Sequence, residues 1–451
     1  MNIVFIGTGY VGLVSGACFA ELGQDVVCVD KDKRKIESLK KGKIPIYEPG
    51  LAELVEKNCK AKRLTFTTST KQALENAEVV FIAVGTPTND KDGSADLSYV
   101  YAAAEEIANY IKDGVTIVTK STVPVGTGKK VTEIIHAKRR GLDFSVASNP
   151  EFLREGCAVN DFLYPDRVIV GVESDDAKNK MERLYKPLTS KGVNLLITDL
   201  ATAELTKYAA NAFLATKIAF INEVADMCER TGANITDLAK GIGMDHRIGA
   251  TYLSPGPGYG GSCFPKDTLA LQHMSAKWGS GEMIVSSVIA SNNERKLNMH
   301  KKVVRALGGK VKGKTIAILG LAFKANTDDM RESPALPIIE SLLKEGANLK
   351  LYDQEAMHKA KDYISGKVQY SKSCYQAIEG ADAAAIVTEW AEFSNLDFDK
   401  IKSLMKTPII IDYRNMYNPQ RMKERGISYY SVGRKEVRVA SLRAVKKVEK
   451  K

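Results

Sequence analysis

The residue most suited to covalent chemistry is Cys263, which lies in a segment rich in glycine and proline. Residues 255–268 read PGPGYGGSCFPKDT, and such a backbone is typical of a loop that wraps a ligand and exposes a thiol. Lys266 and Asp267 follow closely, and a nearby cation favours the thiolate that attacks an electrophile. Most cysteines are small buried hydrophobes, but this glycine-rich setting favours a nucleophile at Cys263 and at no other cysteine.

A pair of polar residues could assist such a thiol. Lys207 and Asn211 are four residues apart in a predicted helix, so they share one face. An ammonium and an amide placed there could both donate to a developing oxyanion, or both could be ordinary solvent-exposed side chains. The spacing leaves the two interpretations open.

A second pair, Glu151 and Glu155, belongs to the segment NPEFLREG at residues 149–156. The pair follows a predicted strand, at the edge where open α/β sheets bind ligands. Two carboxylates in that position could act as acid and base, or could begin a charged helix. The sequence favours neither interpretation.

The first glycines of the chain predict a dinucleotide site. Residues 7–12 read GTGYVG, directly between a predicted strand and a predicted helix. Gly7 would permit the tight turn, Gly9 the approach of a pyrophosphate, and Gly12 close packing on the sheet. Asp30 ends the next strand, where a carboxylate accepts hydrogen bonds from a ribose diol and repels a 2′-phosphate. We therefore expect NAD as the cofactor, in preference to NADP.

Alternating strands and helices at both ends of the chain supply the elements that position these groups. In the first part, strands are predicted at 2–6, 25–30, 78–84, 116–120 and 144–148, with a helix at 97–111. In the last part, strands at 315–320, 349–353, 381–387 and 408–412 alternate with a helix at 337–344. The pattern predicts an α/β protein with two Rossmann-like, doubly wound domains.

Helical spacing dominates the middle of the chain. Residues 201–231 and 286–307 show it, and no convincing strand pattern interrupts them. We expect a long central helix and a helical connector, long enough to form a subunit interface as well. The predicted regions are an N-terminal Rossmann domain (1–199), a central helical dimerisation domain (200–308), a C-terminal Rossmann-like domain (309–433) and a basic tail (434–451).

Composition narrows the class of protein. The chain is 44% hydrophobic and 26% charged and has no apolar run of membrane length, so we expect no membrane partner. It begins on a strand pattern without a secretory signal, which predicts a cytoplasmic protein. Seven scattered cysteines and five histidines argue against a disulfide framework and a metal site. Residues 434–451 carry +6 of the net charge of +11, so we expect a solvated tail and no nucleic-acid partner.

Several motifs occur together in this chain. They are GTGYVG (7–12), IPIYEPGL (44–51), VGTP (84–87), STVPVGT (121–127), NPEFLREG (149–156), GYGGSCFPKD (258–267) and LGLAFKANTDDMRESP (319–334). In this order they resemble the UDP-glucose 6-dehydrogenase family of nucleotide-sugar dehydrogenases, over residues 1–433. The resemblance implies that two molecules of NAD oxidise the primary alcohol of UDP-glucose through an aldehyde to the acid.

The resemblance also implies roles for six catalytic residues. Cys263 would attack the aldehyde to form a thiohemiacetal, whose oxidation gives a thioester that water hydrolyses. Lys207 and Asn211 would stabilise the oxyanions, and Asp267, Thr122 and Glu151 would position water and carry protons. Such a covalent intermediate cannot escape between the two oxidations.

Binding residues follow from the same resemblance. It implies that NAD is contacted by Gly7, Gly9, Val11, Gly12, Asp30, Lys35, Thr86, Thr122, Glu155, Lys266 and Arg331. It implies that the substrate is contacted by Glu151, Phe152, Leu153, Arg154, Glu155, Lys207, Asn211, Tyr252, Leu253, Ser254, Pro255, Gly256, Gly260, Lys324 and Arg414, with Arg247 reaching over from a second subunit. The C-terminal domain would bind the UDP-sugar and no second cofactor, because Ala322 and Ala325 replace glycines of its motif. A homodimer or a higher homo-oligomer would then be the functional unit.

Two other functions stay open. A sister enzyme acting on a UDP-N-acetylhexosamine or on GDP-mannose would need only different sugar contacts at residues 151–155 and 252–260. A non-catalytic NAD-binding scaffold would need none of Cys263, Lys207, Asn211 and Asp267, so the presence of all four argues against it.

Overall fold

The computed structural model describes residues 1–89, 92–281 and 283–439. The chain forms two compact units, which are Met1–Asn211 with Leu269–Gly281, and Ala212–Thr268 with Glu282–Lys451. Helix α9 (Leu200–Thr231) begins in the first unit and ends in the second. Helix α11 (Phe264–Trp278) begins in the second unit and ends in the first.

The first unit is built on a sheet with the order β3-β2-β1-β4-β5-β6-β7-β8. Its strands are β1 (Asn2–Ile6), β2 (Asp25–Val29), β3 (Leu64–Thr67), β4 (Val79–Ile82), β5 (Val115–Thr119), β6 (Phe144–Ser148), β7 (Arg167–Val172) and β8 (Asn194–Thr198). Neighbouring strands are parallel except for β6 and β7, which are antiparallel. The strand order reverses between β1 and β4, so that the carboxyl ends of these two strands flank the crevice where such sheets bind ligands.

Helices cover both faces of this sheet because its central strands alternate apolar side chains between two cores. Ile3 and Phe5 of β1 pack in one core, beneath α1 (Tyr10–Glu21), α3 (Leu51–Lys60), α7 (Ala158–Leu163) and α8 (Asp175–Thr189). Val4 and Ile6 pack in the other core, with α4 (Thr70–Leu74), α5 (Ser98–Ala108) and α6 (Thr127–Lys138). Helix α2 (Lys33–Lys40) follows β2. This arrangement confirms the doubly wound fold predicted for the first part of the chain.

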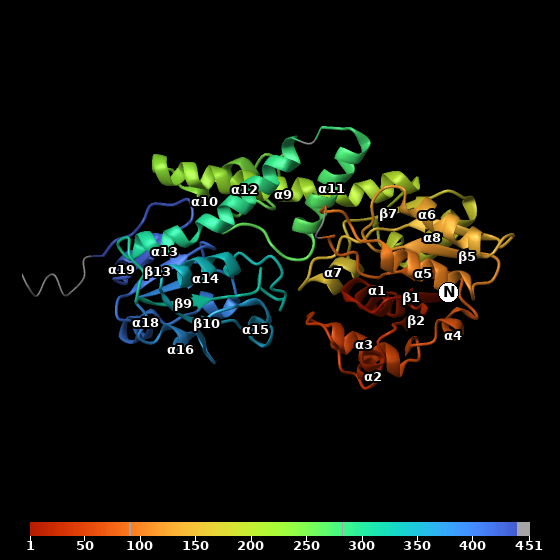
Figure 1. The fold of residues 1–451 in the computed structure, drawn as a ribbon, viewed down its shortest axis with the longest axis horizontal. Coiled ribbons are helices and arrows are strands. Elements are labelled where there is room, and N and C mark those ends of the chain that lie inside the picture. Colours follow the sequence, from red (N-terminus) through yellow and green to blue (C-terminus); the bar gives the residue numbers. More distant parts are fainter. Residues whose placement is uncertain (90–91, 282, 440–451) are drawn as a thin grey trace, which may run out of the picture. The chain divides into compact units, whose positions relative to one another are not determined.

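The second unit contains a parallel sheet with the order β11-β10-β9-β12-β13-β14. Its strands are β9 (Thr315–Leu319), β10 (Asn348–Tyr352), β11 (Val368–Tyr370), β12 (Ala383–Ile386), β13 (Ile409–Asp412) and β14 (Ser428–Ser431). Its helices are α14 (Ala335–Lys344), α15 (Ala360–Tyr363), α16 (Cys374–Ile378), α17 (Ala391–Ser394), α18 (Phe398–Leu404) and α19 (Pro419–Glu424), with a 3-10 turn at Ala356–His358. In Figure 1, α13 and α14 lie on one side of this sheet and α16 and α18 on the other. The second doubly wound fold is therefore confirmed as well.

Helices of the second unit pack beside its sheet. They are α10 (Ile235–Gly243), α12 (Met283–Asn298) and α13 (His300–Ala306), together with the last part of α9. The stretch expected to be helical at 286–307 is divided at Met299, between α12 and α13. No helix in the described part of the chain is long and apolar enough to cross a membrane.

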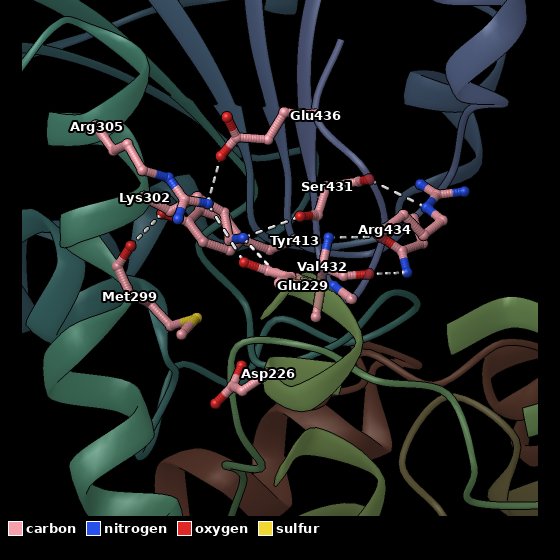
Figure 2. A network of polar contacts seen from close by, with 12 residues as sticks. Asp226, Glu229, Met299, Lys302, Arg305, Tyr413, Ser431, Val432, Arg434 and Glu436 are labelled. Atoms are coloured by element: carbon pink, nitrogen blue, oxygen red, sulfur yellow. Dashed lines mark hydrogen bonds and ion pairs between the residues drawn. The ribbon is translucent and has the colours of Figure 1, made fainter. Parts of the chain in front are cut away.

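A buried polar network ties residues 431–434, at and after the end of β14, to these helices (Figure 2). Lys302 Nζ donates to Glu229 Oε1 at 2.6 Å and to the carbonyl of Ser431 at 2.9 Å. The backbone N–H of Gly433 also donates to Glu229 Oε1, at 2.9 Å. Arg434 is only 8% exposed, so its side chain is not part of the solvated tail expected from residue 434 onwards. The rest of that tail beyond residue 439 lies outside the described residues.

Candidate active site

The glycine motif forms a tight turn at the carboxyl end of β1. Gly7 has φ +103°, and a Cβ there would lie 2.5 Å from the carbonyl oxygen of Ala83. A Cβ on Gly12 would lie 2.0 Å from the carbonyl oxygen of Gly7, so glycine alone permits this contact of α1 with the turn. A Cβ on Gly9 would meet no described atom within 4 Å. The turn therefore has the space and the exposed backbone that a pyrophosphate needs.

Asp30 lies directly beside this turn. Its Oδ2 accepts hydrogen bonds from the backbone N–H and the hydroxyl of Thr8, at 3.0 and 2.6 Å, and from Lys35 Nζ at 3.0 Å. Burial alone would raise the pKa of Asp30, but these hydrogen bonds and one from the backbone of Asp32 lower it to about 2. The side chain is an ionised acceptor at neutral pH, as a ribose diol requires. Lys35 contacts the carboxylate, which fits its predicted place at the cofactor.

Thr86 and Thr122 follow the two strands beyond β1, and their segments are joined to each other. Thr86 Oγ1 donates to the carbonyl of Thr122 at 3.0 Å. Ser121 Oγ donates to the carbonyl of Val84 at 2.7 Å. Since β4 and β5 are parallel neighbours, both threonines lie at the same edge of the sheet as the glycine turn.

Glu151 and Lys207 form a buried ion pair. Lys207 Nζ lies 3.2 Å from Glu151 Oε1, and the two side chains are 3% and 6% exposed. The same ammonium lies 5.3 Å from the centre of the Phe152 ring, on which the Arg167 guanidinium also stacks. Asn211, one turn further along α9, is 6% exposed. Solvent exposure is therefore the wrong interpretation for Lys207 and Asn211.

Glu151 does not begin a helix either. Residues 151–154 have no regular structure, and α7 starts only at Ala158. Glu151 Oε2 accepts a hydrogen bond from the backbone N–H of Leu153 at 2.5 Å, so this loop folds around its own carboxylate. Arg154 is paired with Asp161 on the surface, and its side chain is 58% exposed. Glu155 is only partly buried, so of the two glutamates Glu151 is the one held inside the unit.

A buried lysine beside this ion pair was not predicted. Lys120 follows β5 and is 4% exposed, and its Nζ donates to Asn149 Oδ1 at 3.0 Å. Burial lowers the pKa of Lys120 to about 8, against the attraction of Glu151, while Lys207 lowers it further. Nothing in the sequence indicated this environment, because Lys120 is a single lysine before the STVP segment and belongs to no recognisable pattern. Only the parallel pairing of β5 with β6 brings it to Asn149.

Glu204 is a second residue missed from the sequence, one turn before Lys207 on α9. Its carboxylate oxygens accept from the backbone N–H groups of Gly126 and Gly128, both at 2.7 Å, at the start of α6. Burial raises the pKa of Glu204 to about 7 despite these two hydrogen bonds. Glu204 thereby ties α9 to the loop that carries Thr122.

In the second unit, Cys263 occupies the N-cap of α11. Its carbonyl accepts the first hydrogen bond of the helix, from the backbone N–H of Asp267 at 2.8 Å. Pro265 fits in the first turn because no backbone donor is needed there. The first N–H groups of a helix carry a partial positive charge, and this charge stabilises an anion such as a thiolate placed at the N-cap. Lys266 and Asp267 are paired with each other on the same turn.

Two glycines allow the loop before Cys263 to pack closely against the segment at residues 319–334. A Cβ on Gly260 would lie 2.3 Å from the carbonyl oxygen of Glu332, and one on Gly261 would lie 2.7 Å from the Phe323 ring. The backbone N–H of Gly261 donates to the carbonyl of Arg331 at 2.9 Å. The segment LGLAFKANTDDMRESP therefore packs directly on the cysteine loop.

Arg414 is held at the carboxyl edge of the second sheet. It donates to the carbonyls of Val387 and Phe323, at 2.7 and 2.8 Å, and is paired with Glu389 at 2.9 Å. A Cβ on Gly256 would lie 3.2 Å from Arg414 Nη1, so these two predicted substrate residues are neighbours. Lys324 follows Phe323, and its Nζ lies 5.6 Å from the centre of that ring.

The second sheet has a counterpart of Asp30 that no ribose can reach. Asp353 follows β10 as Asp30 follows β2, but it is 1% exposed. Its oxygens already accept from five donors, namely the backbone N–H groups of Leu321, Ala322, Glu355 and Ala356 and the indole of Trp390. A carboxylate so saturated has no free acceptor for a diol, which supports the expectation that this domain binds no second dinucleotide.

Three other predicted site residues, Leu253, Tyr252 and Arg247, differ in their exposure and backbone conformation. Leu253 is buried in the core of the second unit, so only its backbone is available to a ligand. Tyr252 has φ +64°, a strained conformation outside glycine that is common at ligand sites. Arg247 is paired with Asp245, and its side chain is 79% exposed. No group of side chains in the described residues has the composition of a metal site.

The predicted site residues thus fall into two sets, one on each unit. The first unit holds Gly7, Gly9, Val11, Gly12, Asp30, Lys35, Thr86, Thr122, Glu151, Phe152, Leu153, Arg154, Glu155, Lys207 and Asn211. The second unit holds Arg247, Tyr252, Leu253, Ser254, Pro255, Gly256, Gly260, Cys263, Lys266, Asp267, Lys324, Arg331 and Arg414.

Three family models match the chain in succession. They describe the NAD binding domain (residues 1–189), the central domain (201–294) and the UDP binding domain (317–419) of the UDP-glucose/GDP-mannose dehydrogenase family. The chain belongs to this family. It is accordingly an NAD-dependent oxidoreductase of nucleotide sugars, which confirms the predicted cofactor and class of enzyme. The glycine turn and the ionised Asp30 fit NAD, which accepts hydride when bound.

Relatives of known name cover nearly the whole chain. A UDP-glucose 6-dehydrogenase of Rhizobium meliloti (strain 1021) is 52% identical over 436 residues, which is 96% of this chain and 100% of the relative. The solved structure of a UDP-glucose dehydrogenase from Pyrobaculum islandicum has a TM-score of 0.84 and 37% identity, and covers 91% of this chain and 94% of its own. A UDP-D-ManNAc dehydrogenase from Pyrococcus horikoshii has a TM-score of 0.84 and 29% identity, covering 96% and 99%.

Proposed function

We propose that this chain oxidises UDP-glucose to UDP-glucuronate in two NAD-dependent steps, with the intermediate held on Cys263. The observation that carries the proposal is the place of the thiol at the N-cap of α11, in a loop shaped by glycines. The relatives named UDP-glucose 6-dehydrogenase support the substrate.

In the first oxidation the sugar CH2OH loses a proton and a hydride to become an aldehyde. Lys207 and Asn211 donate to the developing alkoxide, and their burial strengthens this interaction. Thr122 and Glu151 take up and hold the proton through water. The ion pair with Glu151 fixes Lys207 in position.

In the second oxidation the Cys263 thiolate adds to the aldehyde carbon and forms a carbon–sulfur bond. The thiohemiacetal loses its hydroxyl proton and a second hydride to give a thioester. Water then displaces the thiol, which leaves the carboxylate and regenerates Cys263. Asp267, one turn from Cys263 on α11, positions that water. Lys324 and Arg414 hold the diphosphate of the substrate as cations at the edge of the second sheet.

A substrate panel tests this function against the sister enzymes. We expect the purified chain to form two molecules of NADH per UDP-glucose, and at least about 100-fold less with UDP-N-acetylhexosamines or GDP-mannose, because an extra acyl group or another base clashes in a fitted site. NADH absorbance and the uronate product give the readout. Turnover confined to another sugar would assign the sister function, and no turnover with any sugar would support the scaffold.

We also propose that the chain acts as a homodimer or a larger homo-oligomer. Phe213, Phe220 and Met227 lie seven residues apart on one face of α9 and are 67%, 54% and 63% exposed. Three large apolar side chains in one row are typical of a surface that another subunit covers. The exposed Arg247 is available to reach a partner, as the resemblance implies.

Replacing Phe220 with Asp should break this assembly, because a charge cannot be buried in an apolar contact without a partner. We expect the mass measured by light scattering to fall to that of a monomer, and activity to fall with it if Arg247 serves the partner's site. Tyr99→Asp is the matched control, since Tyr99 is 57% exposed on α5 of the first unit. An unchanged mass in Phe220→Asp would contradict the proposed interface.

We propose a cytoplasmic location, which the state of the cysteines supports. All seven lie in described parts of the chain, and none forms a disulfide. A nucleophilic thiol needs a reducing compartment to stay active.

A further inference from the structure

The loop that ends at Cys263 has no secondary structure of its own, yet it is held at defined points. Between residues 254 and 263 no helix or strand is formed. Its peptide groups are instead bound by side chains of α9 and α12. We propose that Asn222, Asn292 and Arg295 act as a clamp that positions Cys263 for attack. The proposal rests on Cys263 being the nucleophile.

The first point of the clamp is Gly256. Asn222 Oδ1 accepts from its backbone N–H at 2.8 Å, and Arg295 Nε donates to its carbonyl at 2.7 Å. Both polar groups of this peptide are therefore satisfied by side chains from two different helices. Arg295 Nη1 also donates to the carbonyl of Asn222 and to Asp226, which fixes the guanidinium against α9.

The second point is Tyr259. Asn292 Oδ1 accepts from its backbone N–H at 2.8 Å, and Asn292 Nδ2 donates to its carbonyl at 3.1 Å. One amide thus pairs with both groups of one residue, as a neighbouring strand would do. The Tyr259 ring is buried against Ala219 and Val288 and meets the Phe264 ring edge-on at 6.1 Å. Phe264 directly follows Cys263, so the anchored ring lies next to the start of α11.

The glycine between these points makes the clamp possible. Gly258 has φ +118°, and a Cβ there would lie 2.9 Å from Lys296 Cγ and 3.0 Å from Asn292 Oδ1. The loop can therefore lie directly on α12 only where no side chain intervenes.

The clamp retains buried donors at a cost in stability. Asn222 and Arg295 are 2% and 7% exposed, and Asn222 Nδ2 and Arg295 Nη2 meet no acceptor among the described residues. Apolar side chains at these positions would avoid that cost. Polar side chains placed there despite that cost favour a role in positioning the loop over a role in packing alone.

The test compares two neighbouring asparagines of α12. Asn292→Ala removes the clamp at Tyr259, whereas Asn293→Ala changes an exposed residue of the same type next to it. The readout is the rate at which Cys263 is alkylated by iodoacetamide, measured by mass spectrometry relative to the exposed Cys157 in the same sample. This ratio reports how reactive and accessible the Cys263 thiol is, and its measurement needs no substrate.

We expect Asn292→Ala to lower the ratio about fivefold or more and kcat by about 10- to 100-fold, with a much smaller change in KM, because small displacements of a reacting group carry such costs. Asn293→Ala should match the wild type in both. Asn292→Asp keeps the acceptor for Tyr259 and loses the donor, so an intermediate ratio is expected. Arg295→Lys keeps the charge but not the guanidinium contacts, and it should also lower the ratio.

A ratio and a kcat within about twofold of the wild type in folded Asn292→Asp and Arg295→Lys would overturn the clamp, since that range is smaller than any real loss of orientation. A lower melting temperature with an unchanged ratio would do the same, because it would assign these residues to packing. Failure of the proposed substrate in the panel would leave the alkylation ratio measurable. The two proposals can therefore fail separately.

Discussion

Cys263→Ser should lose at least about 10³-fold in the rate of net acid formation, because the nucleophile of a covalent mechanism carries a loss of this size. A serine hydroxyl at the N-cap of α11 stays protonated at neutral pH and adds poorly to an aldehyde. The glycine turn and Asp30, which we expect to bind NAD, belong to the first unit and are untouched. NAD affinity measured by fluorescence titration should therefore change by less than about twofold.

The control for this substitution is Cys157→Ser, which removes an exposed thiol elsewhere and should leave turnover unchanged. A second readout is the thioester itself. Rapid quenching of the wild type with substrate and NAD should reveal a mass increase on the peptide that contains Cys263. Full acid production by Cys263→Ser would refute covalent catalysis by this thiol. It would leave the assignment of the chain to the NAD-dependent dehydrogenase family untouched.

Lys207→Met should reduce kcat by about 10²- to 10³-fold, the usual cost of removing one oxyanion donor. The substitution also leaves the buried carboxylate of Glu151 without its ion-pair partner. Breaking a buried pair from one side costs about 3 kcal/mol of stability or more. We therefore expect a clear fall in the urea midpoint together with the loss of activity.

A double-mutant cycle separates the two effects. Glu151→Gln in the Lys207→Met background removes the unpaired charge, so the urea midpoint should recover while kcat stays low. Recovery of activity in the double variant would show that Lys207 serves only to neutralise Glu151. Equal midpoints in all four proteins would instead contradict the buried ion pair.

Much of the fold could be predicted because its signals are local. Apolar runs such as residues 2–6 and 315–319 identify the central strands, and long helical spacing identifies α9. The strands that were missed give weaker signals. Of the five missed strands, β3, β8, β11 and β14 are the edge strands of the two sheets, and β7 runs antiparallel to its neighbour β6. β8 is only partly buried, and β11 is three residues long. Edge and short strands are fixed by pairing with a neighbour, which their own sequence does not encode.

Part of the site could also be predicted, because its signals are local in the sequence. The glycine turn with Asp30 is a motif within one βαβ unit, and the structure bears out its geometry. The status of Lys207 and Glu151 could not be read from spacing, since the two residues come from different elements and pair only when α9 packs on the loop after β6. Lys120 and Glu204 gave no signal at all, because their partners are distant in sequence.

The sequence by itself determined the two nucleotide-binding folds, the helical middle and the cofactor class, because each depends on residues that are neighbours along the chain. The tertiary structure alone decided which charges are buried together, why Asp353 is fully buried while Asp30 stays partly exposed, and how α9 and α12 hold the cysteine loop. Those properties depend on the burial and hydrogen bonding of residues far apart in sequence. Only the packed fold brings them into contact.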